Sequence, residues 1–408
     1  MTDSLRRNRD YRLLWVSQAL SEVGINASMI ALPLLVLAVT GSPAASGLVL
    51  SAGAAAQLIA GLPAGALVDR WNRKKVMLAC EAVQAITVGS LVFVLWTGTA
   101  TVSYMVTVVV VLGVCRALFE PAEDASLPKL VPPEQLSAAV AMNTARGYVG
   151  QLSGTALGGV LFALRRWVPF AVEAVAHVAA FFMLLFLRLP AQERKPAPAG
   201  SFHREVLEGM RWVWRQRLIR MIAVCAIGLN FFFQAFYLMV IALAQQRGVP
   251  AGEIGVMAAM FGGGGILGAL VAPYLHRRVR PHVSIVAVFW ALAVLIPMAI
   301  FAGNGYVMGA LFAAMAFLAP TANTTITTYQ LLLTPDELRG RLSSVMSVTL
   351  GVAAIAGPAV GGVLMEVLSG PQAILACALG VAILAVVATA SPTMRRFPAP
   401  ESLASTSS

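Results

Sequence analysis

The sequence predicts an all-α integral membrane protein, with twelve transmembrane helices in two six-helix bundles related by pseudo-twofold symmetry. Three observations predict this fold. Hydrophobic residues make up 59% of the 408-residue chain and charged residues 12%, whereas charged residues average about 25% in soluble globular proteins. Twelve apolar runs are long enough to cross a bilayer as helices, which takes about 20 residues each. Motifs of the first half of the chain recur in the second half.

Short breaks separate the apolar runs, and several have the composition of turns, such as TGSP at residues 40–43 and SGP at residues 369–371. Gly and Pro in such stretches end helices and start turns. The first run is too long for the apolar core of a signal peptide, so we expect it to be a transmembrane helix. The predicted spans are residues 12–39, 44–68, 76–97, 102–121, 136–163, 168–188, 217–244, 253–275, 282–302, 305–328, 341–368 and 371–391.

Most of the 29 Lys and Arg residues fall on one side of the predicted topology. They lie in the N-terminal tail, the loop at residues 70–75, the central polar stretch and the C-terminal tail. Loops that face the cytoplasm are enriched in Lys and Arg. We therefore expect both termini in the cytoplasm. Orientation then accounts for the net charge of +11, and nucleic-acid binding is not expected.

The chain is also repeated internally. GALVDRWNRK at residues 65–74 aligns with GALVAPYLHR at 268–277, and the same offset of 203 brings GTALGGVL at 154–161 onto GPAVGGVL at 357–364. An offset of half the chain predicts two similar bundles, as in secondary transporters built from repeats. The expected domains are an N-terminal bundle at 1–188, a cytoplasmic central loop at 189–216, a C-terminal bundle at 217–392 and a disordered cytoplasmic tail at 393–408.

The loop between the second and third predicted helices carries an acid followed by spaced cations, in the pattern G-x-x-x-D-R-x-x-R-K-K. This pattern resembles the signature loop of the major facilitator superfamily. The stretches at residues 8–24 and 119–139 resemble the branch of that family that contains macrolide-efflux proteins and the enterobactin exporter. The signature residues in this chain are Gly65, Asp69, Arg70, Arg73, Lys74 and Lys75.

The resemblance implies a multi-pass secondary transporter of the bacterial inner membrane, which moves a small molecule by alternating access. GQLSGTALGG at residues 150–159 is also similar to the antiporter signature of the family, with Thr155 where proline is usual. The expected function is therefore proton-coupled efflux of a drug-like or natural-product molecule. Proton-coupled uptake of a metabolite, and a receptor or scaffold that transports nothing, are the alternatives.

Sequence motifs for enzyme chemistry are missing from the chain. It has no Walker A, HExxH or GxSxG motif, and its four histidines lack the spacing of metal ligands. We expect no enzyme activity, no cofactor and no bound metal. The expected partners are a small-molecule substrate, protons and the lipid bilayer, and the chain is expected to be a monomer.

Ionisable residues inside predicted spans are candidates for proton coupling, because a charge in a membrane costs roughly 2.5–3.5 kcal/mol and needs a partner or a role. Glu22 lies near the middle of the first span, and Glu173 and His177 lie four residues apart in the sixth. Burial favours the neutral form of a carboxyl group, so Glu22 would bind a proton from one side and release it to the other. Arg116 matches an arginine linked to coupling in relatives. Structural hydrogen bonds and ion pairs are the alternative for all four.

Polar and aromatic residues on predicted helices are candidates to line a substrate cavity. Gln18 and Asn26 flank Glu22 on one helix face, and the stretch at residues 229–243 combines amides with aromatic rings. Aromatic side chains that face lipid would give the same pattern. The candidates are Gln18, Asn26, Asn143, Gln151, Asn230, Phe233, Gln234, Tyr237 and Asn323.

Asp69 adds nothing to the positive charge of its loop, so it is expected to have a separate role. We expect its carboxylate to cap the positive N-terminal end of the helix predicted at 341–368, around Gly340 to Ser343. Such a contact would act as a conformational latch that forms when the cytoplasmic side is closed. The repeat has Ala272 at the matching place, so the latch would be one-sided.

Overall fold

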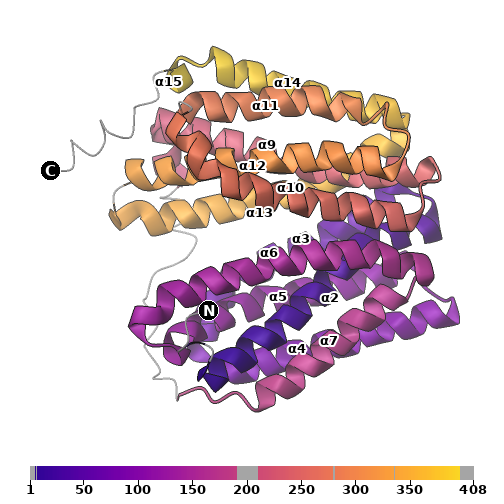
Figure 1. Ribbon diagram of the computed structural model, residues 1–408, viewed down its shortest axis with the longest axis vertical. Coiled ribbons are helices and arrows are strands. Elements are labelled where there is room, and N and C mark those ends of the chain that lie inside the picture. Colours follow the sequence, from indigo (N-terminus) through magenta and orange to yellow (C-terminus); the bar gives the residue numbers. More distant parts are fainter. Residues whose placement is uncertain (1–4, 6, 191–209, 279–280, 335, 396–408) are drawn as a thin grey trace. The chain divides into compact units, whose positions relative to one another are not determined.

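The computed structural model describes residue 5 and residues 7–190, 210–278, 281–334 and 336–395, and the regular secondary structure of these ranges is helical (Figure 1). Twelve of the helices have 18 residues or more, which confirms the predicted all-α membrane fold. They are α2 (Arg9–Thr40), α3 (Pro43–Arg70), α4 (Arg73–Thr97), α5 (Val102–Leu130), α6 (Pro133–Leu164), α7 (Val168–Leu185), α9 (Arg217–Gln246), α10 (Ala251–Arg278), α11 (Pro281–Met298), α12 (Gly305–Leu333), α13 (Asp336–Val367) and α14 (Gly370–Ala390), and a short α15 (Pro392–Arg395) follows.

The predicted turns are formed by the residue types that favour them. Helix α2 ends at Gly41, whose φ of 69° lies in the left-handed region that a residue without a Cβ adopts at little cost. Ser42 then caps α3 by accepting a hydrogen bond from the Ala45 N–H, and Pro43 occupies the first turn. Two residues therefore end one membrane-length helix and start the next.

The predicted end of the fourth span was wrong. The sequence suggested an end near residue 121, but α5 continues to Leu130 through Pro121 and Pro128. The polar stretch at 120–129 is held in the helix because its side chains find partners. Glu123 and Ser126 are buried, and both make hydrogen bonds.

The chain divides into two compact units, Met1–Pro198 with Gln245–Ala259, and Ala199–Ala244 with Met260–Ser408. In the first unit α2 packs against α6 and α7, α3 packs against α5, and α4 packs against both α5 and α7. In the second unit α11 packs against α12 and α14. The sequence boundary at 189–216 falls largely on residues 191–209, which lie outside the described part of the chain, as does most of the predicted tail.

One end of the first unit, here called the basic end, holds the start of α2 and the ends of α5 and α7. The Asn8 side chain donates to the Leu130 carbonyl at 2.6 Å, and the Arg188 N–H donates to Asp10 Oδ1 at 3.0 Å. Lys74, at the start of α4, donates to the Leu185 carbonyl at 2.8 Å. Helices of this unit thus run alternately up and down, as the sequence predicts.

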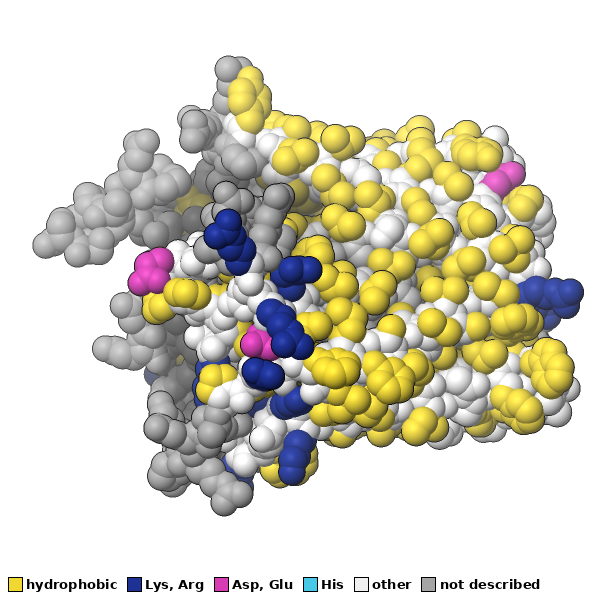
Figure 2. Space-filling model, turned by 60° about the horizontal axis from the view of Figure 1, so that its bottom comes forward, with side chains coloured by type: hydrophobic (Ala, Val, Ile, Leu, Met, Phe, Trp, Pro, Cys, Tyr) yellow, Lys and Arg dark blue, Asp and Glu magenta, His cyan; other side chains and the backbone are white. Residues whose placement is uncertain are grey.

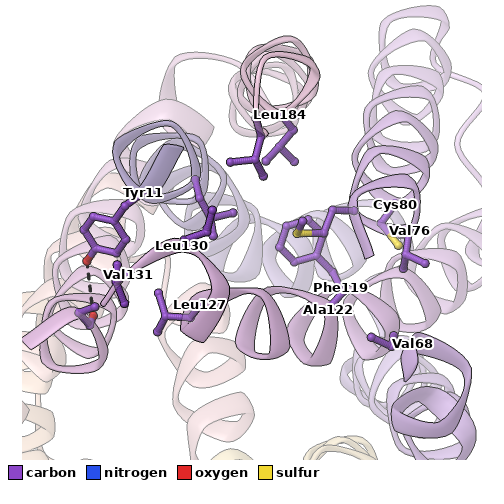
Figure 3. Close-up of a cluster of buried hydrophobic side chains, with 14 of the residues drawn as sticks. Tyr11, Val68, Val76, Cys80, Phe119, Ala122, Leu127, Leu130, Val131 and Leu184 are labelled. Carbon is purple, nitrogen blue, oxygen red and sulfur yellow. Dashed lines mark hydrogen bonds between the residues drawn. The ribbon is translucent and has the colours of Figure 1, made fainter. Parts of the chain in front are cut away.

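A hydrophobic cluster fills the interior beside the basic end (Figure 3). Tyr11 of α2 is almost fully buried, and its hydroxyl donates to the Ala139 carbonyl at 3.4 Å. Leu127 and Leu130 bring the last turns of α5 into the cluster, and Leu184 contributes from α7. The polar extension of α5 is therefore anchored by apolar residues on its other face.

The outer faces of the helices are apolar. Ile86 and Trp96 on α4, and Val175 on α7, are large hydrophobic side chains that are more than two-thirds exposed. An exposed apolar surface of this extent indicates contact with lipid. Among the described residues, eleven helices are long and apolar enough to span a membrane, and α11 has a shorter apolar stretch, His282–Met298. Figure 2 shows such a hydrophobic face, with Lys and Arg side chains gathered mainly at one end.

Glycines bring α6 against α2. A Cβ added to Gly154 would lie 2.6 Å from the Asn26 Cβ, and one added to Gly158 would overlap the Ala27 carbonyl oxygen. No side chain fits at either place without a shift. Small residues that let helix backbones approach are a common basis of helix packing in membranes.

The same contact recurs in the second unit, between α13 and α9. A Cβ added to Gly357 would lie 2.7 Å from the Gln234 Cβ, and one added to Gly361 would lie 2.7 Å from the Ala235 carbonyl oxygen. Gly357 and Gly361 are the residues that the sequence repeat aligns with Gly154 and Gly158. The repeat therefore preserves a specific helix-to-helix contact as well as a sequence pattern.

Candidate functional site

A cluster of polar side chains, here called the acid–imidazole cluster, lies buried among α2, α4 and α7. Glu81, Glu173 and His177 are each at most 3% exposed. His177 Nδ1 lies 2.6 Å from Glu81 Oε2, and His177 Nε2 lies 3.7 Å from Glu173 Oε1. Gln18 Nε2 donates to Glu81 Oε1 at 3.1 Å, and the Ser21 hydroxyl donates to the same oxygen at 3.4 Å.

Helix geometry explains why these residues meet. Glu173 and His177 are four residues apart on α7, so they share one face of that helix. On α4, Glu81 shares the buried face with Met77 and Gln84. Gly24 allows α7 to approach α2 closely, because a Cβ at that position would lie 2.8 Å from the Glu173 Cα.

Glu81 is the member of this cluster that the sequence reading missed. Its position inside the apolar run 76–97 was the signal that could have identified it, since an acid within a span needs a partner or a role. The predicted pair of Glu173 and His177 does lie together, four residues apart on one buried face. Gln18, predicted to line a substrate cavity, is bound to Glu81.

Glu22, the first proton candidate, lies outside the acid–imidazole cluster. Its side chain is half-buried, and Asn26 donates to its carboxylate at 3.2 Å and to its backbone carbonyl at 2.7 Å. Gly150 of α6 faces it, because a Cβ there would lie 2.7 Å from the Glu22 Cβ. The predicted polar stripe therefore contacts two different helices. Gln18 is bonded to α4, whereas Glu22 and Asn26 face α6.

Arg116 and Arg146, two arginines of the first unit, form separate ion pairs. Arg116 Nε lies 2.7 Å from Glu120 Oε1, with side chains 41% and 52% exposed. Arg146 Nη1 lies 2.8 Å from Glu123 Oε1, with side chains 8% and 10% exposed. The first pair lies within α5, whereas the second joins α5 to α6.

The signature loop is fixed to the basic end of the first unit. Arg73 lies 3.3 Å from Asp69 and donates to the Ala125 carbonyl at 2.7 Å. Lys74 is bound to the end of α7, as described above, and Gly65, Arg70 and Lys75 are exposed. The side chains of residues 340, 341 and 343, which include the expected latch contact of Asp69, lie outside the described part of the chain.

Aromatic rings gather around the candidate residues of α9. Phe233 stacks on Phe261 of α10 with ring centroids 5.1 Å apart. The Tyr237 ring lies 6.4 Å from Phe233 and 6.3 Å from Phe312 of α12. These distances are typical of favourable aromatic pairs. The predicted aromatic residues thus belong to one cluster inside the second unit.

The predicted amides of the second unit lie on the same helix as this aromatic cluster. Asn230 donates to the Ala226 carbonyl at 3.2 Å, and Gln234 packs against Gly357. Asn143 and Gln151 are half-buried on α6, whereas Asn323 is exposed on α12. Asn143 and Gln151 belong to the first unit and Asn323 to the second.

Known proteins resemble this chain along its whole length. The profile of the Major Facilitator Superfamily matches residues 14–329 and 223–407. The multidrug efflux pump Tap of Mycolicibacterium fortuitum is 26% identical over 399 residues, covering 92% of this chain and 93% of that protein. The enterobactin exporter EntS of Salmonella typhi is 26% identical, covering 88% of this chain and 86% of that protein.

A solved structure supports the fold independently. The nucleoside transporter NupG superposes with a TM-score of 0.77 at 14% identity, covering 95% of this chain and 99% of that chain. At this identity the likeness establishes the fold alone. The family profile and the two similar proteins point to the same family of transporters, and the fold is consistent with it.

Proposed function

The chain belongs to the major facilitator superfamily, and from that membership we propose that it exports a small molecule in exchange for protons by alternating access. The observation that carries the proton coupling is the acid–imidazole cluster. A His side chain between two carboxylates, buried inside spanning helices, is a chemical group that can accept and release a proton. Ionisable residues at such places mark proton relays in pumps and transporters.

The proposed direction of transport is outward. Two relatives that match most of this chain are named as exporters. The signature loop carries four cations within six residues, at Arg70 and 73–75, which fits a cytoplasmic position for the basic end. The proposed location is the bacterial inner membrane, with both termini in the cytoplasm.

The proposed substrate is a bulky amphipathic molecule of the drug or natural-product type. Support comes from the aromatic cluster of α9, α10 and α12, since α9 also carries the amides of Asn230 and Gln234. Mostly apolar sites with a few polar groups are typical of small-molecule binding. Asn26 stands at the corresponding place of the first unit, because Gly154 faces it as Gly357 faces Gln234.

Transport in proteoliposomes tests the proposal. The purified protein is reconstituted, a pH gradient is imposed, and the movement of two fluorescent amphipathic dyes, ethidium and anilinonaphthalene sulfonate, is recorded. We expect gradient-driven movement of at least one dye, with loss of that movement when nigericin collapses the gradient. The absence of gradient-dependent flux for both dyes and for a wider panel of amphipathic compounds would refute proton-coupled export.

Replacement of Glu22 separates the two candidate sites of proton binding. Glu22→Gln keeps the hydrogen bond with Asn26 but removes the carboxylate. If Glu22 carries a coupled proton, gradient-driven flux falls by about 10²-fold or more, the low end of what an essential proton-transfer group contributes. Glu134→Gln, an exposed acid in the first turn of α6, serves as the control. Normal flux in Glu22→Gln removes it as a carrier and leaves the acid–imidazole cluster.

A further inference from the structure

The two ring nitrogens of His177 have different surroundings. Nδ1 lies 2.6 Å from Glu81, a hydrogen-bond distance, whereas Nε2 lies 3.7 Å from Glu173, too far for a direct bond. Nε2 is buried, and none of the described residues bonds to it. A polar contact of this length is one that a water molecule can bridge. One nitrogen is therefore fixed by a carboxylate, and the other is open to a proton.

Glu81 is surrounded by hydrogen-bonding partners. Its Oε1 accepts hydrogen bonds from Gln18 and Ser21, and its Oε2 faces His177. Paired with an ionised carboxylate, which only accepts hydrogen bonds, Nδ1 of His177 is the donor. Glu81 thus serves as a fixed countercharge for the imidazole ring.

Glu173 differs because it also lines a cavity. This cavity of about 180 Å³ lies inside the first unit and is also lined by Ser28, Gln57, Gln84 and Arg116. Glu173 Oε2 and Ser28 Oγ are buried and have no hydrogen-bond partner among the described residues. A water molecule needs about 10–15 Å³ of such space and two to four polar partners. The cavity has room and polar groups for several waters.

The residues that line this cavity differ in exposure. Glu173 is 3% exposed, whereas Arg116 has a side chain that is 41% exposed and paired with Glu120. Helices α2, α3, α4, α5 and α7 all contribute to its wall. Water in the cavity would therefore extend from the acid–imidazole cluster toward an exposed ion pair.

The groups that face His177 come from three helices besides its own. Glu81 acts on it from α4, the Cys115 thiol lies near it on α5, and Glu173 acts from α7 itself. From α2, the cluster receives the uncharged side chains of Gln18 and Ser21. Among the residues that line the cavity, the cationic one is Arg116.

We propose that this cavity is a hydrated proton entrance, in which Glu173 takes up the proton, His177 stores it and Glu81 stabilises the stored charge. A hydronium ion in the cavity gives its proton to the Glu173 carboxylate, which becomes a carboxylic acid, and leaves water behind. Through one bridging water, the proton passes to His177 Nε2. The Glu173 carboxylate is regenerated, and the imidazolium then lies between two carboxylates. The reverse sequence releases the proton.

The assignment rests on the proposed function for its physiological purpose, but it is tested without substrate and without a gradient. Protein in lipid nanodiscs is mixed with buffer of lower pH, and proton uptake is followed with a soluble pH indicator. The rate reports access to the site, and the amplitude reports how many protons are stored. ¹⁵N-histidine spectra, with His177→Gln to identify the signal, show whether His177 is the group that becomes charged.

Substitution of Glu173 should change the rate of proton uptake, and substitution of Glu81 should change its amplitude. Glu173→Gln is expected to slow proton uptake by about 10²-fold, the low end for loss of a positioned proton-transfer group, while His177 still becomes charged. Glu81→Gln is expected to lower the amplitude and to leave His177 mostly neutral. If Glu173→Gln takes up protons at the parent rate, Glu173 is not the entrance. If Glu81→Gln charges His177 as fully as the parent protein, the countercharge role is wrong.

The cavity itself is tested by filling it. Val88 lines the cavity and is fully buried, whereas Ile86 on the same helix is 72% exposed. Val88→Phe should slow uptake without changing the amplitude, and Ile86→Phe should behave as the parent protein. Equal rates for both variants would overturn the cavity as the route.

A second measurement keeps the test decisive if Val88→Phe does not fold. Ser28→Cys places a thiol on the cavity wall, and Ser17→Cys places one at a buried site away from it. A small water-soluble methanethiosulfonate should modify the first and not the second, and the four buried native cysteines give the background. Failure to modify Ser28→Cys means that the cavity is closed to water. If the protein transports no substrate, the results on proton uptake and thiol modification are still valid. If those experiments contradict the proton entrance, export of a substrate is still testable separately.

Discussion

Two ion pairs of the first unit differ mainly in how deeply the protein buries them. The pair of Arg146 and Glu123 is at least 90% buried, whereas the pair of Arg116 and Glu120 is about half exposed. Removal of one partner from a buried pair leaves an uncompensated charge, which costs about 3–5 kcal/mol. An exposed pair contributes about 0.2–1 kcal/mol, because water and salt screen it.

This difference gives a prediction for stability. Arg146→Met should lower the free energy of unfolding by about 3–5 kcal/mol, and Arg116→Met should lower it by less than about 1 kcal/mol. The measurement is reversible unfolding in mixed micelles of increasing sodium dodecyl sulfate. The double variant Arg146→Met, Glu123→Leu should recover most of the loss, because no charge is left alone. Similar losses in the two single variants would show that burial does not separate the pairs.

At the level of single residues, the sequence could locate intramembrane charges but not their partners. Glu173 and His177 were identified because four residues along one helix is a local relationship. Glu81 is 96 residues from His177, and only the packing of α4 against α7 brings them together. For the same reason, Gln18 was grouped with Glu22 by spacing, although the structure bonds it to Glu81 on another helix.

The helix pair α2–α6 depends on glycines that touch the partner backbone. Gly158→Ala should lower the free energy of unfolding by about 1–3 kcal/mol, the usual cost of overpacking, because the new methyl group overlaps the Ala27 carbonyl. Gly147→Ala on the same helix is the matched control, since nothing lies within 4 Å of its added Cβ. The same unfolding assay applies. A Gly158→Ala protein as stable as the control would mean that the helices do not approach as described.

At the level of elements, the apolar pattern predicted which segments are helices, and the least successful boundary was that of α5. A hydrophobicity pattern records where lipid ends, and α5 continues beyond that point. Its last turns are stabilised by Arg146 from α6 and by apolar contacts of Leu127 and Leu130. Such contacts are made by other parts of the chain, so local sequence carries no sign of them.

The orientation of the whole molecule in the membrane is predicted by its charges and can be measured directly. Asn72 and Thr99 lie at opposite ends of α4, and both are exposed. In intact cells, a membrane-impermeant maleimide should label Thr99→Cys, and it should label Asn72→Cys only after the cells are opened. The native cysteines are buried and should label weakly. The opposite pattern would place the basic end outside the cell.

At the level of the molecule, composition, span count and repeat were enough to predict the fold, because each is a property of the whole sequence. The repeat extends to structure, since the glycine contacts of α6 on α2 return in α13 on α9. The acid–imidazole cluster does not repeat in sequence: the position of Glu81 carried forward by 203 is Ser284. The sequence repeat therefore predicts the helix packing that the two halves share. Positions where the repeat fails, such as Glu81, identify residues that are specific to one half.

The distance along the chain between Glu81 and His177 also bears on how the protein is made. At about 5–20 residues per second, the ribosome needs roughly 5–20 s to synthesise the 96 residues that separate them. During that interval the acid of α4 has left the ribosome while its histidine has not been translated. Until α7 is made, the described partners of Glu81 are the uncharged donors Gln18 and Ser21 of α2, and an acid in lipid costs roughly 2.5–3.5 kcal/mol. Arrival of α7 brings His177, which completes the bonding of Glu81.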